Sequence, residues 1–299
     1  MFPAAILAAS LVFTPADARL AHTTAGLIVA NATPRDAGTR GAFSAANIIL
    51  NAASAAGADT RIDTFSAPTP KGARYFTNVI AKFEKDPALG WIVFVSHYDT
   101  KPGSGCPGAN DGASTSGLLV AMCESLKRQE KILACNVMFI WTDGEECIER
   151  YSAVDGLWGA RRAAQMLKDD RCDVKGVICL DMLGDRDLGV SIPRNTSSYL
   201  RKAALAVADA TPLKGRVKAI SEMIKDDHVP FAEAGFEAVT LIDFEYGSEK
   251  GLNDYWHTPE DTMDKISEKS LHEAGSLAMK FLDILPYVDK PSPKRKRKR

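Results

Sequence analysis

Short, continuous apolar runs alternate along the chain with longer amphipathic segments. Runs such as residues 91–95 and 137–141 contain no polar position, which is typical of strands covered on both faces of a sheet. The predicted strands are residues 61–65, 76–83, 91–95, 137–141, 176–180 and 238–242. The predicted helices are residues 36–56, 112–129, 157–167, 197–208 and 267–285. This alternation predicts a single α/β domain with a central mixed, largely parallel sheet flanked by helices.

The composition agrees with one folded domain followed by a charged end. With 299 residues, 45% hydrophobic and 25% charged, the chain can bury the core of one large α/β domain. Its net charge of −1 includes six consecutive basic residues at 294–299, so the rest of the chain is acidic. An acidic surface argues against nucleic-acid binding by the domain. The tail at 289–299 contains no aliphatic or aromatic residue, and we expect it to be disordered.

The N-terminus has the features of an export signal. Residues 4–13 form an apolar stretch too short to span a bilayer, and Ala16-Asp17-Ala18 has the small-x-small form of a cleavage site. No Lys or Arg precedes this stretch, which departs from the usual pattern. We expect a signal peptide at 1–18, a domain at 19–288, and export to the periplasm or the exterior. No later segment is long and apolar enough to predict a stable membrane span.

The six cysteines include no Cys-x-x-Cys pair, which argues against a thiolate zinc site. An oxidising compartment would permit disulfides. Cys106 and Cys147 lie in predicted loops beside candidate ligands and are the first pair to consider. Cys123 and Cys179 lie in apolar runs and are predicted to be buried free thiols.

Five short motifs place His, Asp or Glu beside predicted strands or at strand-to-loop junctions. They are residues 96–100 (SHYDT), 110–112 (NDG), 143–146 (DGEE), 180–182 (LDM) and 256–259 (WHTP). Open α/β sheets bind ligands beyond the carboxyl ends of their strands, so these side chains are expected to converge. Imidazole and carboxylate groups without thiolates suit a catalytic zinc site. The set therefore predicts a zinc enzyme.

The first two motifs contain a candidate ligand each. His97 ends the strand at 91–95, and Asp99 is placed to orient its ring rather than to bind metal. A structural histidine is the alternative for His97. Asp111 precedes a predicted helix, where an aspartate also serves as an ordinary N-cap. In a tight turn its carboxylate can instead present one or both oxygens to an ion.

Two adjacent glutamates, Glu145 and Glu146, follow the strand at 137–141. Neighbouring side chains at a strand end point in different directions, so one can bind metal while the other stays free as a general base. Crowding two like charges raises the pKa of one of them, which suits acid–base chemistry near neutral pH. The alternative is a solvated loop.

Three further positions carry candidate groups. Asp181 ends an apolar run, where an unpaired carboxylate would be costly, so it is expected to bind metal or to accept a strong hydrogen bond. Asp226 and Asp227 precede a short predicted helix, and capping accounts for only one of them. His257 lies just before the last helix, within the motif at 256–259.

In this order the motifs resemble the zinc aminopeptidases of peptidase family M28 and, more closely, the related glutaminyl-peptide cyclotransferases, over roughly residues 60–285. The segments 64–80, 143–161 and 226–228 resemble the cyclotransferases. Asp226 is the most diagnostic residue, because the aminopeptidases more often carry serine there. Three features differ from the cyclotransferases: Tyr151 stands where a pocket tryptophan is usual, residues 110–114 are aminopeptidase-like, and the segment 245–254 is longer.

The resemblance implies a zinc ion held by three residues, Asp111, Glu146 and His257. Glu145 would be the general base, and Asp181 and Asp226 would share hydrogen bonds that hold it and stabilise a tetrahedral intermediate. Tyr151 and Trp256 would wall the substrate pocket. A second zinc ion, if present, would be held by His97, Asp111 and Asp181.

The activity that this resemblance implies is cyclisation of an N-terminal glutamine to pyroglutamate with release of ammonia, on peptide or protein N-termini. The alternative is a metallo-aminopeptidase that cleaves N-terminal residues from peptides. A third interpretation is a binding protein that keeps the fold without chemistry. One bound zinc ion would favour the first activity and two the second; the oligomeric state is open.

Overall fold

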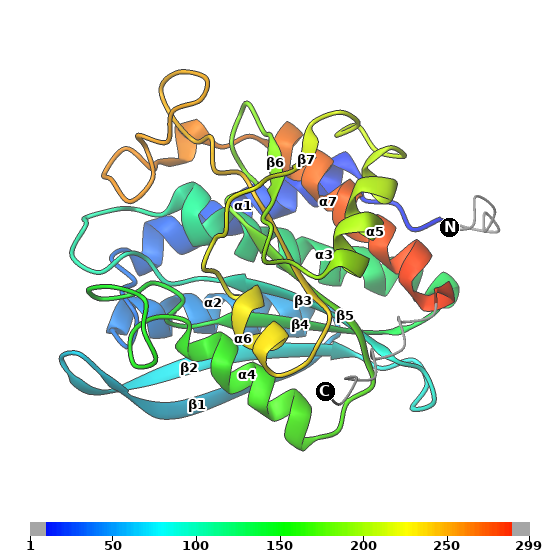
Figure 1. The fold of residues 1–299 in the computed structure, drawn as a ribbon, viewed down its shortest axis with the longest axis horizontal. Coiled ribbons are helices and arrows are strands. Elements are labelled where there is room, and N and C mark those ends of the chain that lie inside the picture. The colour runs from blue at the N-terminus through cyan, green and yellow to red at the C-terminus, as the bar shows by residue number, and fades with distance from the viewer. Residues whose placement is uncertain (1–9, 289–299) are drawn as a thin grey trace, which may run out of the picture.

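A mixed eight-stranded sheet runs through the middle of the molecule (Figure 1). A computed structural model describes residues 10–288. Across the sheet the strands follow the order β1-β2-β4-β3-β5-β8-β6-β7. Their bounds are β1 Asp59–Thr69, β2 Gly72–Phe83, β3 Trp91–His97, β4 Asn136–Thr142, β5 Val174–Asp181, β6 Val190–Ile192, β7 Val217–Ala219 and β8 Ala238–Ile242.

The centre of the sheet is parallel and its margins are mixed. Strands β4, β3, β5 and β8 are parallel neighbours. On one side β2 pairs antiparallel with β4 and with β1, and on the other β6 pairs antiparallel with β8 and parallel with β7. The predicted mixed, largely parallel sheet is confirmed. The short strands β6 and β7 were not predicted.

Helices cover both faces of the sheet. Those of residues 10–288 are α1 Pro15–Ala32, α2 Arg40–Ala55, α3 Thr115–Gln129, α4 Trp158–Asp169, α5 Ser198–Ala208, α6 His228–Glu233 and α7 Glu268–Ile284. Alternate residues of β3 face opposite layers, as the period of a strand requires. Ile92 and Phe94 join the larger core under α1, α2, α3, α5 and α7, whereas Val93 and Val95 join the smaller core under α4 and α6. Burial on both faces explains the continuous apolar runs.

Helix α1 begins inside the segment that the sequence assigns to an export signal. Thr14 caps it: its hydroxyl accepts the Asp17 amide, and the Asp17 carboxylate accepts the Thr14 amide in return. Leu11 and Phe13 are buried in the larger core. The folded region thus includes residues 10–18, and the expected boundary after Ala18 falls within α1 rather than between two elements. Residues 1–9 and the tail at 289–299 lie outside the described residues, and export stays a prediction.

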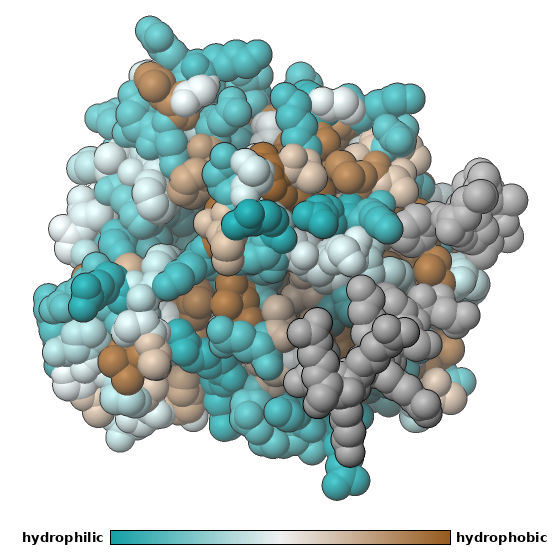
Figure 2. All heavy atoms as spheres, in the orientation of Figure 1, coloured by the Kyte–Doolittle hydropathy of each residue, from teal (hydrophilic) through white to brown (hydrophobic). Residues whose placement is uncertain are grey.

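The surface on the face drawn in Figure 2 is mostly hydrophilic, with small apolar patches between the polar side chains. Among residues 10–288, no helix has both the length and the apolar character needed to cross a bilayer.

Candidate active site

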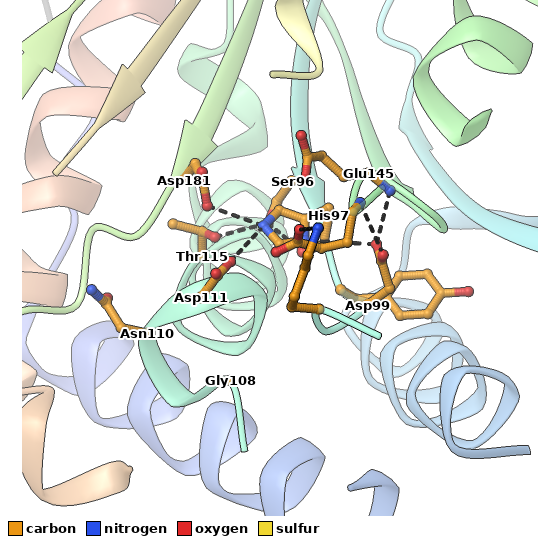
Figure 3. A network of polar contacts seen from close by, with 12 residues as sticks. Ser96, His97, Asp99, Gly108, Asn110, Asp111, Thr115, Glu145 and Asp181 are labelled. Carbon is orange, nitrogen blue, oxygen red and sulfur yellow. Dashed lines mark hydrogen bonds and ion pairs between the residues drawn. The ribbon is translucent and has the colours of Figure 1, made fainter. Parts of the chain in front are cut away.

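The carboxyl ends of β4, β3 and β5 meet at one edge of the sheet and carry most of the predicted site (Figure 3). His97 and Asp181 are the last residues of β3 and β5. Glu145 and Glu146 lie in the loop after β4, and Asp111 lies in an irregular turn before α3. Because parallel neighbours end together, residues separated by up to 84 positions come into hydrogen-bond contact, as His97 and Asp181 do.

Four of these side chains, together with His257, form two clusters that share Asp111. In the inner trio (His97, Asp111, Asp181), His97 Nε2 lies 3.1 Å from an oxygen of each carboxylate. In the outer trio (Asp111, Glu146, His257), His257 Nε2 lies 2.6 Å from Glu146 Oε1 and 3.4 Å from Asp111 Oδ2. Within each trio the candidate ligand atoms lie within 4.8 Å of one another. Both predicted ligand sets are therefore brought together.

The outer trio fits a divalent cation. Glu146 Oε2 is buried and has no hydrogen-bond partner, only an ion pair of 3.8 Å with Lys101 Nζ, so this oxygen can still accept a ligand. The donors are one imidazole and two carboxylates, a set typical of catalytic zinc sites. Burial and the Asp111 charge raise the pKa of Glu146. Burial lowers the pKa of His257, but hydrogen bonds with Asp111 and Glu146 outweigh this and raise it to about 9. Both shifts reflect groups that hold a proton where an ion would sit.

Asp99 binds the backbone of both glutamates. Its carboxylate oxygens accept the backbone amides of Glu145 at 3.0 Å and Glu146 at 3.2 Å. The predicted contact with His97 is not a hydrogen bond: His97 Nδ1 lies 3.6 Å from Asp99 Oδ1 and has no hydrogen-bond partner. Asp99 thus acts mainly on the glutamate backbone, and this contact directs Glu146 to the outer trio while Glu145 remains outside both trios.

Glu145 is buried and accepts hydrogen bonds from Tyr151. The Tyr151 hydroxyl lies 2.9 and 3.1 Å from its two carboxylate oxygens. Burial and then the charge of Glu146 raise the pKa of Glu145 well above its usual value. A raised pKa favours the protonated carboxyl, which is the direction that suits a group that accepts a proton and returns it.

Asp226 lines the same cavity, and its carboxylate is held by hydrogen bonds from β8 and from the next residue in the chain. Its carboxylate accepts the hydroxyl of Thr240, on β8, and the backbone amide of Asp227. The Asp227 carboxylate in turn accepts the hydroxyl of Thr142, at the end of β4. Burial raises the pKa of Asp181 to about 7, and the charge of Asp226 adds to this shift. The relay from Asp226 and Asp181 to Glu145 stays a prediction.

A cavity of about 400 Å³ opens above the outer trio. Its lining includes the predicted residues Asp111, Glu145, Glu146, Tyr151, Asp181, Asp226, Trp256 and His257. The rest of its wall is mostly apolar, with Ile224 and Phe244 among its side chains, and also includes the charged residues Glu222 and Lys225. Trp256 stacks on His257 with ring centroids 3.8 Å apart, and Phe244 contacts Trp256 edge-on. The cavity joins a charged floor to an apolar wall, which suits a small substrate with a polar reacting group.

Two residues that support Asp111 were missed by sequence reasoning. Asp261 accepts the backbone amides of Asn110 at 2.7 Å and Asp111 at 3.0 Å, and it also accepts the Tyr246 hydroxyl at 2.7 Å. It thereby ties the segment that carries His257 to the Asp111 turn. The available signal is its position four residues after His257, just beyond the motif at 256–259.

Arg35 supports the same turn through hydrogen bonds to its backbone carbonyls. Its guanidinium is fully buried and donates to the carbonyls of Tyr98, Pro107, Gly108 and Asp111 at 2.5–3.2 Å. Gly108 has a φ of 63°, and a Cβ there would lie 2.5 Å from Arg35 Nη2. The turn thus needs glycine at this point. No motif marks Arg35 in the sequence.

The six cysteines are free in the structure, so the pair Cys106 and Cys147 forms no disulfide. The Cys106 thiol faces the Asp261 carboxylate, whereas the Cys147 thiol contacts Lys101 Nζ at 3.0 Å. Each thiol therefore has a different polar neighbour. Cys123 and Cys179 are buried free thiols as predicted.

The chain is similar to proteins of two activities on this fold. A glutaminyl-peptide cyclotransferase of Drosophila melanogaster is 30% identical over 238 residues, which cover 70% of this chain and 65% of the relative. The crystal structure of Acidobacteriales bacterium glutaminyl cyclase matches with a TM-score of 0.84 at 31% identity, over 95% of this chain and 98% of that one. A Zn-dependent exopeptidase from Parabacteroides distasonis matches with a TM-score of 0.79 at 20% identity, over 92% and 99% of the two chains, a likeness of fold alone.

The family follows from the extent of the sequence match. The matched part of the chain spans only 65% of the length of the Drosophila relative. Residues 78–282, more than half of the chain, match the family model of peptidase family M28. That range contains both trios, Glu145 and Asp226. The chain belongs to peptidase family M28.

Proposed function

We propose that this protein is a zinc-dependent glutaminyl-peptide cyclotransferase, which converts an N-terminal glutamine to pyroglutamate and ammonia. The observation that carries the proposal is the unequal exposure of the two trios. Asp111, Glu146 and His257 all line the cavity, whereas His97 does not and is enclosed by two carboxylates. One accessible metal position beside a free carboxylate suits the cyclase. The similarity to glutaminyl cyclases supports the same conclusion.

The outer trio would hold the zinc ion. When bound there, zinc acts as a Lewis acid and polarises the side-chain amide of the substrate glutamine. Asp261 and Arg35 keep the backbone of Asp111 in place, since they bond its amide and its carbonyl respectively. The protein therefore provides a preformed position for the ion.

Glu145 would carry the proton through the reaction. Its carboxylate accepts a proton from the substrate α-amine as the amine nitrogen forms a bond to the side-chain amide carbon. It then returns that proton to the departing nitrogen, which leaves as ammonia. The raised pKa of Glu145, caused by burial and by Glu146, suits both transfers. No water molecule is consumed.

Asp181 and Asp226 would hold Glu145 and stabilise the tetrahedral intermediate through shared hydrogen bonds. Both carboxyl groups line the cavity with Glu145. A pKa of about 7 for Asp181, caused by burial, lets this carboxyl keep a proton to donate near neutral pH. Trp256 and Phe244 form an apolar wall against which the methylene groups of glutamine can pack. We also propose export, on the N-terminal pattern alone.

A metallo-aminopeptidase is the second candidate. It is favoured by the inner trio, whose ligand atoms also lie within 4.8 Å of one another and share Asp111 with the outer trio. Each trio would hold one ion, with Asp111 common to both, and the ions would supply the activation of water that cleavage of the first peptide bond requires. The fold is common to both activities, as the exopeptidase neighbour illustrates.

A side-by-side assay separates the two functions. Purified protein is incubated with a peptide that has N-terminal glutamine and with leucine amide, and products are identified by mass spectrometry. The proposal expects pyroglutamyl peptide from the first substrate and little leucine from the second. Zinc is measured on the same dialysed sample, with about one ion per chain expected. Two tight ions with release of leucine, and no pyroglutamate, would establish the peptidase instead.

A further inference from the structure

We propose that Tyr151 is a positioning residue for the general base, held over Glu145 by a loop built for that purpose. The base loop is defined here as residues 147–157, between Glu146 and α4. This inference rests on the proposed function, because it concerns the residue that moves the proton in that reaction. It gives Tyr151 a role beyond that of a pocket wall.

The hydroxyl of Tyr151 spans the carboxylate of Glu145. It lies 2.9 Å from Oε1 and 3.1 Å from Oε2. Among residues 10–288, both hydrogen bonds that reach this carboxylate come from Tyr151. A donor centred between two oxygens fixes the plane of the carboxylate and leaves its other lone pairs toward the cavity. The base is thereby oriented before substrate arrives.

The first half of the base loop is organised by Asp155. Its carboxylate is buried and accepts three successive backbone amides, from Ile148 at 2.6 Å and from Glu149 and Arg150 at 2.9 Å. The Ser152 amide donates to the Asp155 carbonyl at 2.9 Å. These bonds close the loop around one side chain and fix the backbone on both sides of Tyr151.

In the second half of the loop, Gly156 packs against the ring of Tyr151. Gly156 has a φ of 80°, and a Cβ there would lie 2.5 and 2.8 Å from Tyr151 Cδ1 and Cε1. The same Cβ would lie 3.0 Å from the Glu145 carbonyl oxygen, which accepts the Leu157 amide at 2.9 Å. The ring thus packs directly on the Gly156 backbone. Tyr151 and Glu145 are joined twice, through side chains and through the loop backbone.

Two substitutions test this arrangement by different routes. Tyr151→Phe removes the hydroxyl and keeps the ring. Gly156→Ala keeps the hydroxyl but places a methyl group where the ring lies. Each is expected to lower kcat about 10–100-fold, with KM within about twofold of wild type and the zinc content unchanged, because a hydrogen bond to a buried charged group is lost. The kcat of the double variant should be only slightly lower than that of either single variant, because both substitutions disrupt the same contact between Tyr151 and Glu145.

Tyr75→Phe is the matched control, because Tyr75 is 72% exposed and its loss of a hydroxyl should leave kcat unchanged. Thermal melts of all variants show that folding is intact. A Tyr151→Phe enzyme with wild-type kcat overturns the proposal, as does a rise in KM with kcat unchanged, which would make Tyr151 a pocket wall only. Fully additive effects of the two substitutions would also overturn it.

The same variants are assayed on leucine amide, so that the two proposals fail separately. If wild type releases leucine and forms no pyroglutamate, the cyclase function is wrong, and the Tyr151 effect is read on the peptidase reaction, in which Glu145 is again the base. Crystal structures of wild type and Tyr151→Phe give a readout independent of activity. A Glu145 carboxylate that turns away from its wild-type position supports the proposal, and an unmoved carboxylate contradicts it.

Discussion

The inner and outer trios share Asp111, yet their members differ in exposure and in their hydrogen-bond and ion-pair partners. In the inner trio, His97 is 2% exposed and bridges two carboxylates at 3.1 Å each. In the outer trio, the His257 side chain is 17% exposed, and Glu146 Oε2 has no hydrogen-bond partner but lies 3.8 Å from Lys101 Nζ. Burial alone would lower the pKa of His97, but Asp181 and Asp111 outweigh it and raise the pKa well above its usual value.

This difference shows how one set of residue types can serve two purposes. His97 Nε2 already contacts both carboxylates of the inner trio at 3.1 Å. In the outer trio, Glu146 Oε2 accepts no hydrogen bond and has only a long ion pair with Lys101, so a cation there adds a bond that the protein does not make itself. We therefore expect the outer trio to bind zinc and the inner trio to remain a hydrogen-bonded support.

The largest effect should come from emptying the outer trio. His257→Ala is expected to lower zinc affinity more than about 100-fold, which exceeds the usual effect of removing a mere ligand support, and to abolish activity. His97→Gln, its counterpart in the inner trio, should keep one zinc ion per chain. Elemental analysis after dialysis makes the comparison. Equal zinc loss in both variants would show that the trios are not different in function.

Separating the metal ligand from the base gives the next effect. Glu145→Gln should reduce turnover about 10²–10⁴-fold while zinc content stays near wild type, because the lost group transfers protons and binds no ion. Its neighbour provides the matched control: Glu146→Gln should lose zinc and activity together. Zinc content and initial rate are measured on the same preparations. Loss of zinc in Glu145→Gln would contradict the division of roles between these adjacent residues.

A smaller effect is expected where the support lies outside both trios. Asp226→Ser should lower the rate of glutamine cyclisation about 10–100-fold with zinc retained, since a buried charged acceptor is removed. Thr240→Val removes only the hydroxyl that donates to Asp226 and should act in the same direction more weakly. Rates on the glutamine peptide and on leucine amide are compared. Cleavage of leucine amide that survives intact in Asp226→Ser would favour the peptidase.

The smallest effect concerns the stability of the zinc-free protein. The folded-state pKa of His257 is about 9, against about 6.5 when unfolded, so its stabilisation is present below about pH 6.5 and is lost as pH rises through about 9. The melting temperature of chelated protein should fall by a few degrees over this range. His257→Gln should flatten that part of the curve. A melting temperature that rises with pH between these values would show that the sign is wrong.

The sheet could be predicted because its central strands are buried on both faces. Residues 91–95 and 137–141 show this as unbroken apolar runs, and the structure extends them only slightly to β3 and β4. Strands β6 and β7 have three residues each, too few to form a pattern. Helix α1 was missed for the opposite reason. Its first residues and those before it are apolar and small, and these properties also describe an export signal.

The ligand positions could be predicted because each lies at a strand end or in a tight turn with a recognisable neighbourhood. Arg35 and Asp261 could not, because they bond backbone carbonyls and amides. Such contacts place no demand on the residue type at the other end. Arg35 reaches carbonyls 63–76 positions away, and nothing near it in the sequence indicates that distance. Tyr151 was predicted at the cavity, but its bond to Glu145 depends on a loop shape that only the structure shows.

Helix α1 also constrains the order in which the chain can complete its fold. Phe13 packs on Gly275 of α7, and the Ala21 carbonyl lies where a Cβ of Gly117 in α3 would be, so the first helix touches both the middle and the last. Helix α1 therefore completes its packing on α3 and α7 only after those helices, which follow much later in the sequence, have been synthesised. Until then the side of α1 that packs on α3 and α7 lacks its partners. Helix α7, the last α-helix of residues 10–288, completes the packing around α1.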